Sequence, residues 1–304
     1  MVTIDEVRAA RQRIAGRVRR TPILTTGPVS YKLELLQHAG SFKTRGMLNQ
    51  ILAGAERGLP AAGVIAASGG NAGLAAAYAA RELGAAAEVY VPETAPAVKV
   101  AKLTKLGANV VQTGTEYAQA YEAARVQQRA TGALFCHAYD DAAMVAGNGT
   151  LGLELLDQLP DGFDTVLVAV GGGGLVAGVA AAMPPGVRVV AVEPVTCAAL
   201  HAALEAGAPV DVPVSGVAAD SLGARRIGDI AYEMAVLKGL GHVLVDDQAI
   251  VDARRQLWED FRIVVEHGTA AAQAALTSGA YRPAVGERVV VLLCGGNTNP
   301  ADLA

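Results

Sequence analysis

Residues 166–177 read Val-Leu-Val-Ala-Val-Gly-Gly-Gly-Gly-Leu-Val-Ala and combine the three parts of one structural unit. Five apolar residues predict a buried strand, four glycines predict a loop, and the residues that follow predict the start of a helix. The glycines expose backbone N–H groups at the helix N-terminus, where the helix dipole adds positive potential. This stretch therefore predicts a phosphate-binding loop in an α/β fold, with a tight turn that binds nothing as the alternative.

The same alternation of strand and helix continues on both sides of this unit. Strands are expected at residues 64–67, 87–91, 110–111, 134–136, 165–170, 187–192 and 289–293. Helices are expected at residues 74–83, 97–106, 116–130, 175–183 and 250–261. This order predicts an α/β fold with parallel or mostly parallel sheets flanked by helices. Two strand–glycine–helix units, about a hundred residues apart, indicate two lobes.

Composition limits the class of protein. The chain has 304 residues, of which 52% are hydrophobic and 18% charged, and its net charge is −4. This charge argues against nucleic acid or an anionic membrane as the partner. Residues 165–187 are uncharged over the length of a membrane span, but their glycines and a proline pair favour a strand, a loop and a helix. The scattered cysteines Cys136, Cys197 and Cys294 argue against a disulfide framework and favour a cytoplasmic location.

Lys43 lies in the polar stretch 41–46 (Ser-Phe-Lys-Thr-Arg-Gly), directly before an apolar run. Its amine becomes a nucleophile if partial burial or a cationic neighbour such as Arg45 lowers its pKa. A nucleophilic amine can form a Schiff base with an aldehyde cofactor. For this residue taken alone, a surface lysine at a helix start is the alternative.

Two further glycine loops follow expected strands. Residues 68–73 (Ser-Gly-Gly-Asn-Ala-Gly) can hold a carboxylate at the next helix N-terminus, where Asn71 can donate to a phenolic oxygen. Ser68 and Asn71 are also ordinary helix caps and turn residues. Residues 292–297 (Leu-Leu-Cys-Gly-Gly-Asn) stand at the carboxyl end of a buried strand, where ligands gather in open α/β sheets. Cys294 is there either a site residue or a plain buried thiol.

The tetraglycine loop also allows a different class of function. Gly172, Gly174 and Ala177 fit the G-x-G-x-x-A spacing of a dinucleotide site. Glu193 follows about 20 residues later, where a ribose-binding acid would stand. A nicotinamide-dependent oxidoreductase therefore stays open, although it leaves Lys43 and the other two glycine loops without a role.

As an ordered set, the motifs resemble the fold type II enzymes that depend on pyridoxal 5'-phosphate (PLP), specifically the serine/threonine dehydratase and serine racemase group. The resemblance extends over nearly the whole chain. It rests on residues 21–24 (Thr-Pro-Ile-Leu), 31–34 (Tyr-Lys-Leu-Glu), 40–46, 137–141 (His-Ala-Tyr-Asp-Asp), 146–150 (Ala-Gly-Asn-Gly-Thr) and 192–194 (Val-Glu-Pro). It implies a two-domain fold like that of the tryptophan synthase β-subunit. Residues 1–55 and 139–304 would form the large cofactor-binding domain, and residues 56–138 the small substrate-binding domain.

The resemblance also implies roles for the site residues. Lys43 would form the Schiff base with PLP and then act as the base at the substrate Cα. The cofactor would further contact Phe42, Asn71, Gly171, Gly172, Gly173, Gly174, Glu266 and Cys294. The substrate would contact Ser68, Gly70, Asn71 and Ala72.

Cys294 stands where the family places a neutral Ser or Cys beside the pyridine nitrogen. A thiol does not keep that nitrogen protonated as a carboxylate would, so prompt loss of a β-leaving group is favoured. The resemblance thus implies an ammonia-lyase, or dehydratase, that converts L-threonine or L-serine to a 2-oxo acid and ammonia. Another β-elimination or replacement, such as dehydration of 3-hydroxyaspartate, and serine racemisation are alternatives.

Several residues depart from the family pattern. Gly69 replaces the serine that racemases use as a base on the second face of Cα, which argues against racemisation. Ala72 replaces a histidine and opens the carboxylate pocket. Ser221 and His267 replace a glycine and a proline, with no consequence that the sequence reveals.

Metal binding and assembly are less defined by the sequence. Some members of the family bind a divalent cation through the acid at the position of Glu193. Ala199 replaces their second acid, so Glu193 is a candidate ligand but a complete metal site is not expected. The resemblance implies a homodimer. Because the chain stops soon after the third glycine loop, the regulatory domain of biosynthetic threonine dehydratases is not expected.

Overall fold

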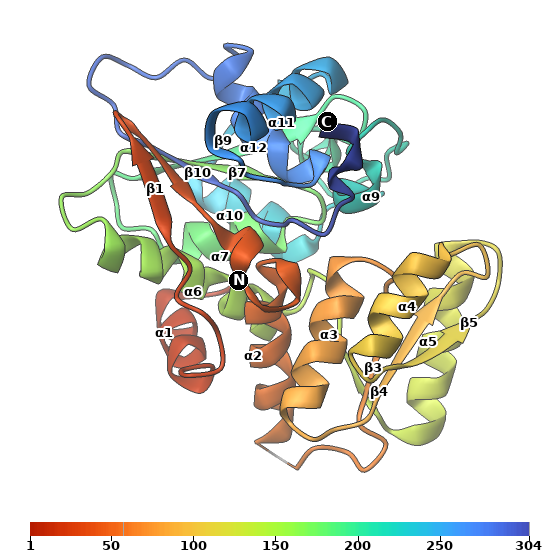
Figure 1. Cartoon of the computed structure of the whole chain (residues 1–304). Coiled ribbons are helices and arrows are strands. Elements are labelled where there is room, and N and C mark those ends of the chain that lie inside the picture. The colour runs from red at the N-terminus through yellow and green to blue at the C-terminus, as the bar shows by residue number, and fades with distance from the viewer. Residues whose placement is uncertain (57, 304) are drawn as a thin grey trace.

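The computed structural model describes residues 1–56 and 58–303, and its strands form two separate sheets (Figure 1). The larger sheet has six strands in the order β1-β2-β10-β7-β8-β9. These strands are β1 (Ile23–Thr26), β2 (Val29–Lys32), β7 (Thr165–Ala169), β8 (Arg188–Pro194), β9 (Gly241–Val245) and β10 (Val289–Leu292). β1 and β2 form an antiparallel hairpin, whereas the other neighbouring strands run parallel.

The smaller sheet is entirely parallel, with the strand order β5-β4-β3-β6. Its strands are β3 (Val64–Ala67), β4 (Ala87–Val91), β5 (Asn109–Gln112) and β6 (Leu134–Phe135). The helices between them are α3 (Asn71–Glu82), α4 (Ala97–Lys105) and α5 (Tyr117–Thr131). α3 and α5 cover opposite faces, because Ala66 packs in the core that contains α3 whereas Ile65 packs in the core that contains α5.

The large sheet is buried on both faces, since alternate residues of its strands enter two different cores. Val166 and Val168 pack in one core, and Leu167 and Ala169 in the other. The first face is covered by α1 (Ile4–Arg13), α6 (Ala142–Gln158), α7 (Gly174–Ala182), α8 (Ala199–Ala206) and α10 (Asp229–Lys238). The second face is covered by α9 (Ala219–Leu222), α11 (Asp247–Phe261) and α12 (His267–Thr277).

The helix α2 (Lys43–Ala55) joins the two parts of the molecule (Figure 1). Its residues Met47, Leu48 and Ile51 pack in the core of the smaller sheet, while its other side packs against α6. Short 3-10 turns precede it and end the chain, as η1 (Glu34–Leu36), η2 (His38–Gly40) and η3 (Pro300–Leu303). Domain boundaries after residues 55 and 138 stay a proposal.

The α/β fold with mostly parallel sheets is confirmed, and each expected strand and helix is present within a few residues of its expected ends. The uncharged stretch 165–187 forms β7, the glycine loop and α7. Within residues 1–56 and 58–303, no helix combines the length and apolar character needed to cross a bilayer. The β1–β2 hairpin was not expected, because its four-residue strands carry only a weak alternating pattern.

Candidate active site

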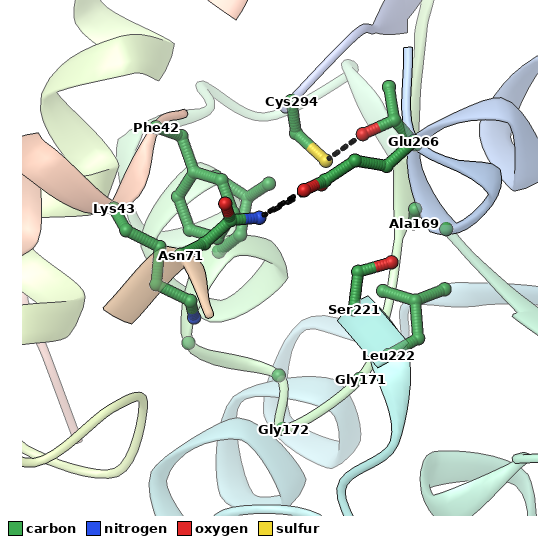
Figure 2. A pocket seen from close by; sticks show the side chains of 15 residues that line it. Phe42, Lys43, Asn71, Ala169, Gly171, Gly172, Ser221, Leu222, Glu266 and Cys294 are labelled. Atoms are coloured by element: carbon green, nitrogen blue, oxygen red, sulfur yellow. Dashed lines mark hydrogen bonds between the residues drawn. The ribbon is translucent and has the colours of Figure 1, made fainter. Parts of the chain in front are cut away.

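A cavity lies where the carboxyl ends of β7 and β10 meet the first turns of several helices. It encloses about 470 Å³ of space, part of which opens to solvent. Figure 2 shows side chains from distant parts of the chain converging on it. Its lining residues are Phe42, Lys43, Asn71, Ala169, Gly171, Gly172, Gly173, Gly174, Leu175, Ser221, Leu222, Glu266, Gly268, Thr269 and Cys294.

Lys43 is the first residue of α2 and extends into this cavity (Figure 2). The backbone at this position is fixed, because the N–H of Phe42 donates to the carbonyl of Cys294 at 3.0 Å. The Lys43 amine donates to the carbonyl of Ala138 at 3.0 Å and lies 4.8 Å from the centre of the Phe42 ring. Burial lowers the pKa of Lys43 to about 8, against the opposing effects of Cys294 and Glu266. About one tenth of this amine is therefore neutral and nucleophilic at pH 7, far more than for an exposed lysine.

Of the two causes considered for a lowered pKa of Lys43, burial accounts for the shift, and Arg45 is not among its causes. Its guanidinium is fully buried and donates to both carboxylate oxygens of Glu34, at 2.8 and 2.6 Å. It also lies 3.0 Å from a carboxylate oxygen of Glu154, which in turn pairs with the buried amine of Lys32. The charge of Arg45 is thus compensated within this cluster, which anchors the first turn of α2.

The tetraglycine loop between β7 and α7 forms one wall of the cavity, and its backbone leaves no room for side chains. A Cβ on Gly172 would lie 2.3 Å from Cγ of Tyr139, and a Cβ on Gly174 would lie 2.6 Å from the carbonyl oxygen of Tyr139. Gly173 has a φ of +86°, and a Cβ there would lie 2.3 Å from Cβ of Ala231. The loop is therefore packed against the protein on one side, and on the other its four glycines line the cavity as a backbone cradle at the N-terminus of α7, where an anion is favoured.

Asn71, the first residue of α3, is held in the cavity by a chain of side-chain amides and a carboxylate. Its Nδ2 donates to both oxygens of Glu266, at 3.0 and 2.8 Å, and its Oδ1 accepts from Nδ2 of Asn297 at 2.7 Å. Burial raises the pKa of Glu266, while the hydrogen bond from Asn71 acts in the opposite direction. Figure 2 shows the bond between Asn71 and Glu266, and the bond from Asn297 joins the first helix of the smaller sheet to the third glycine loop.

Cys294 follows β10 and closes the end of the cavity next to Thr269, whose hydroxyl lies 3.3 Å from its sulfur. Burial raises the pKa of Cys294 to about 11, so the thiol is neutral at physiological pH. Together with Cys136 and Cys197 it is buried and free of disulfide bonds.

Comparison with known proteins identifies the family. The family model described as "Pyridoxal-phosphate dependent enzyme" matches residues 14–295. This chain is a pyridoxal-phosphate dependent enzyme. An L-threonine ammonia-lyase from Geobacter sulfurreducens is 38% identical, over 98% of this chain and 76% of that protein. A phenylserine dehydratase from Ralstonia pickettii is 35% identical, over 99% of this chain and 95% of that protein. The structure of maize serine racemase covers 99% of this chain and 95% of its own, with a TM-score of 0.91 and 31% identity.

The cavity of this PLP enzyme has the parts that the cofactor requires. The tetraglycine loop suits a phosphate, because it lies at a helix N-terminus and is held in one position by the surrounding protein. A Cβ at any of its four glycines would clash with neighbouring atoms. The partly neutral amine of Lys43 suits an aldehyde. These features also argue against a nicotinamide-dependent oxidoreductase, since a dinucleotide site would leave the Lys43 amine without a role.

Not every expected substrate residue lines the cavity. Ser68, Gly70 and Ala72 lie in the loop and first turn beside Asn71, but outside the cavity wall. The hydroxyl of Ser68 accepts from the N–H of Gly70 at 3.2 Å, and α3 has no side-chain cap, so Ser68 and Asn71 are not its caps. A Cβ on Gly69 would meet Val91 Cγ1 at an ordinary 3.4 Å, so a side chain fits there.

Glu193 does not line the cavity, and both of its carboxylate oxygens accept hydrogen bonds within the protein. One oxygen accepts from the N–H of Leu200 at 2.7 Å. The other accepts from the N–H of His201 at 2.9 Å and lies 3.1 Å from Nε2 of His242. No cluster of three or more metal-binding side chains is present among the residues that the structure describes.

Six lining residues were not expected from the sequence: Ala169, Leu175, Ser221, Leu222, Gly268 and Thr269. Ser221 and Leu222 come from the short helix α9, and Gly268 follows Glu266 at the start of α12. The Ser221 side chain fits only because residue 268 is a glycine, since a Cβ on Gly268 would lie 2.2 Å from the Ser221 hydroxyl oxygen. The replacement of a family glycine by Ser221 was the one available signal, and it marked a wall of the cavity.

Proposed function

We propose that the protein is a PLP-dependent ammonia-lyase that converts L-threonine, L-serine or both to a 2-oxo acid and ammonia by β-elimination. The observation that carries this proposal is the Lys43 amine, whose pKa is lowered to about 8 in a cavity that contains both an amide cradle and a neutral thiol. The ammonia-lyase and dehydratase relatives support the choice of reaction.

The bound cofactor supplies an aldehyde that captures the substrate amine and a ring that withdraws electrons from Cα. The four glycines hold its phosphate through their amides. Lys43, in its neutral form, removes the proton from Cα. The carboxylate of the substrate would lie at the N-terminus of α3 beside Asn71, which lines the cavity, and Ser68, Gly70 and Ala72, which lie next to it, would complete the carboxylate pocket.

Cys294 would contact the cofactor ring, and its neutral thiol would favour β-elimination because it places no negative charge at that end of the cavity. As Cα loses its proton, the β-hydroxyl leaves as water, and the proton that Lys43 takes from Cα balances the proton that the hydroxyl needs to leave. The released enamine takes up water and gives the 2-oxo acid and ammonia, so all atoms of the substrate are accounted for.

The direct test is the Lys43→Ala variant. Purified wild-type protein should show the visible absorbance of bound PLP and release ammonia from L-threonine or L-serine. Lys43→Ala should lose that absorbance band and at least about 1,000-fold in activity, since one residue both binds the cofactor and moves the proton. Lys99→Ala, on α4, is the control and should keep both. Equal absorbance in wild type and Lys43→Ala would refute the proposed role of the amine.

A panel of amino acids decides between substrates. L-threonine, L-serine, 3-hydroxyaspartate and phenylserine should each be assayed for ammonia and oxo-acid release. The proposal expects the highest kcat/KM with L-threonine or L-serine. A higher value with phenylserine or 3-hydroxyaspartate would keep the reaction and reject the substrate.

Racemisation is not proposed for this protein, because Gly69 offers no base on the second face of Cα. We further propose a cytoplasmic homodimer with domain boundaries after residues 55 and 138. The three free, buried cysteines support the reducing compartment. Light scattering should give twice the mass of one chain, and a single-chain mass would reject the dimer.

A further inference from the structure

Asn148, in the middle of α6, lies between the lysine helix and the phosphate cradle. Its side chain is fully buried. Its Nδ2 donates to the carbonyl of Gly174, the last glycine of the cradle, at 3.3 Å. Its Oδ1 faces Gly46, one turn after Lys43, since a Cβ on Gly46 would lie 2.6 Å from that oxygen. One side chain therefore contacts both structural parts that must meet around the cofactor.

Glycine contacts fix the position of α6 on both sides of Asn148. A Cβ on Gly147 would lie 2.6 Å from the carbonyl oxygen of Arg45 in α2. A Cβ on Gly178 of α7 would lie 2.4 Å from the carbonyl oxygen of Val145. Because backbone touches backbone at both crossings, α6 cannot shift without moving α2 or α7. The helix α6 thus fixes the position of the tetraglycine loop relative to Lys43.

The orientation of the Asn148 amide is determined by its surroundings. Were the amide flipped, its oxygen would face the Gly174 carbonyl oxygen, and two acceptors would repel each other. In the observed orientation, Oδ1 has no donor among the described residues. The chain therefore keeps a buried oxygen unpaired in order to place a donor on Gly174.

The Gly174 carbonyl belongs to the same peptide unit as the N–H of Leu175, which lines the cavity. The first N–H groups of a helix have no partner within it and point away from its start. A hydrogen bond donated to a carbonyl polarises its peptide unit and strengthens the N–H as a donor. Asn148 thus acts on the cradle without touching the cavity.

We propose that Asn148 is a positioning residue for the cofactor phosphate: it holds the Gly174–Leu175 peptide with its N–H toward the cradle, in fixed register with the Lys43 helix. This depends on the binding of PLP alone and is independent of which amino acid is the substrate.

The test compares two ligands, PLP and pyridoxal, which lacks the phosphate. Apoprotein is titrated with each, and binding is followed by absorbance. Asn148→Leu keeps the shape of the side chain and removes the donor. It should weaken PLP binding about five- to tenfold, the size expected for one lost hydrogen bond. It should leave pyridoxal binding unchanged. An equal loss for both ligands, or no loss for either, overturns the proposal.

Asn49→Leu is the matched control. Asn49 is also buried on the α2–α6 contact and donates to a backbone carbonyl, that of Ala143, at 2.7 Å. Its replacement should lower stability and keep the ratio of PLP to pyridoxal affinity. If Asn148→Leu does not fold, Asn148→Ala undergoes the same two titrations with the same expected result. A failed ammonia assay would reject the proposed reaction but would leave this ratio, and hence the role of Asn148, intact.

Discussion

β7 and β8 are neighbours in the large sheet, and each is followed by a helix N-terminus with backbone amides that need a partner. After β7, four glycines at the start of α7 line the cavity and supply no side chain that could accept from the helix amides. After β8, the carboxylate of Glu193 occupies the corresponding position and accepts from the amides of Leu200 and His201 in α8. The comparison teaches that a helix N-terminus binds an external anion only where the chain does not supply its own. The N-terminus of α8 is occupied by the carboxylate of Glu193, whereas the N-terminus of α7 follows four glycines and is left for a ligand.

The strongest way to break this comparison is to damage the open N-terminus. Gly173→Ala should weaken PLP binding at least about 100-fold, because the new Cβ would lie 2.3 Å from Cβ of Ala231 at a φ of +86°. Titration of the apoprotein measures this. Gly207→Ala is the control, since it has a similar φ of +72° but no atom within 4 Å of the new Cβ. It should keep full affinity; a loss as large as that of Gly173→Ala would show that backbone strain alone is responsible.

The second way is to empty the filled N-terminus. Glu193→Ala should lower the free energy of unfolding by about 3 kcal/mol, because buried amides lose charge-assisted hydrogen bonds. Urea unfolding measures this. The vacated amides should then accept an anion, so sulfate should restore more stability in the variant than it adds to wild type. Equal effects of sulfate on both proteins would contradict the comparison. PLP affinity should stay unchanged.

The smallest expected effect concerns the protonation of the Lys43 amine, which lies in the same cavity as the N-terminus of α7. With a pKa of about 8, only about one tenth of the Lys43 amines are neutral at pH 7. Since a lowered pKa makes the neutral form dominant above pH 8, capture of PLP by apoprotein should rise about tenfold between pH 7 and a plateau above pH 9. Stopped-flow absorbance measures this. A midpoint near pH 10.5 would mean that the amine is not perturbed by burial.

The sequence predicted the central elements well because β7, β8, β10 and the glycine loops carry strong local patterns. It also gathered Lys43, Asn71, the four glycines, Glu266 and Cys294 into one set, and all of them line the cavity. Their roles toward the cofactor stay predictions.

What the sequence could not show depends on packing between distant segments. Ser221 and Gly268 are far apart in the chain, yet the Ser221 hydroxyl fills the space that a side chain at residue 268 would need. No local sequence pattern predicts this contact. The pairing of Arg45 with Glu34 and Glu154 likewise follows from the meeting of three segments, so the sequence did not reveal which groups its charge faces. The partners of Glu193 include His242, which reaches it only through the pairing of β8 with β9.

The Arg45 cluster also bears on how the holoenzyme is assembled. All of its charges belong to the polypeptide, and removing one of them would leave a buried charge without compensation. The position of the lysine helix therefore depends on charges that the polypeptide itself supplies. PLP would then bind at a site whose lysine helix the protein holds in place without it.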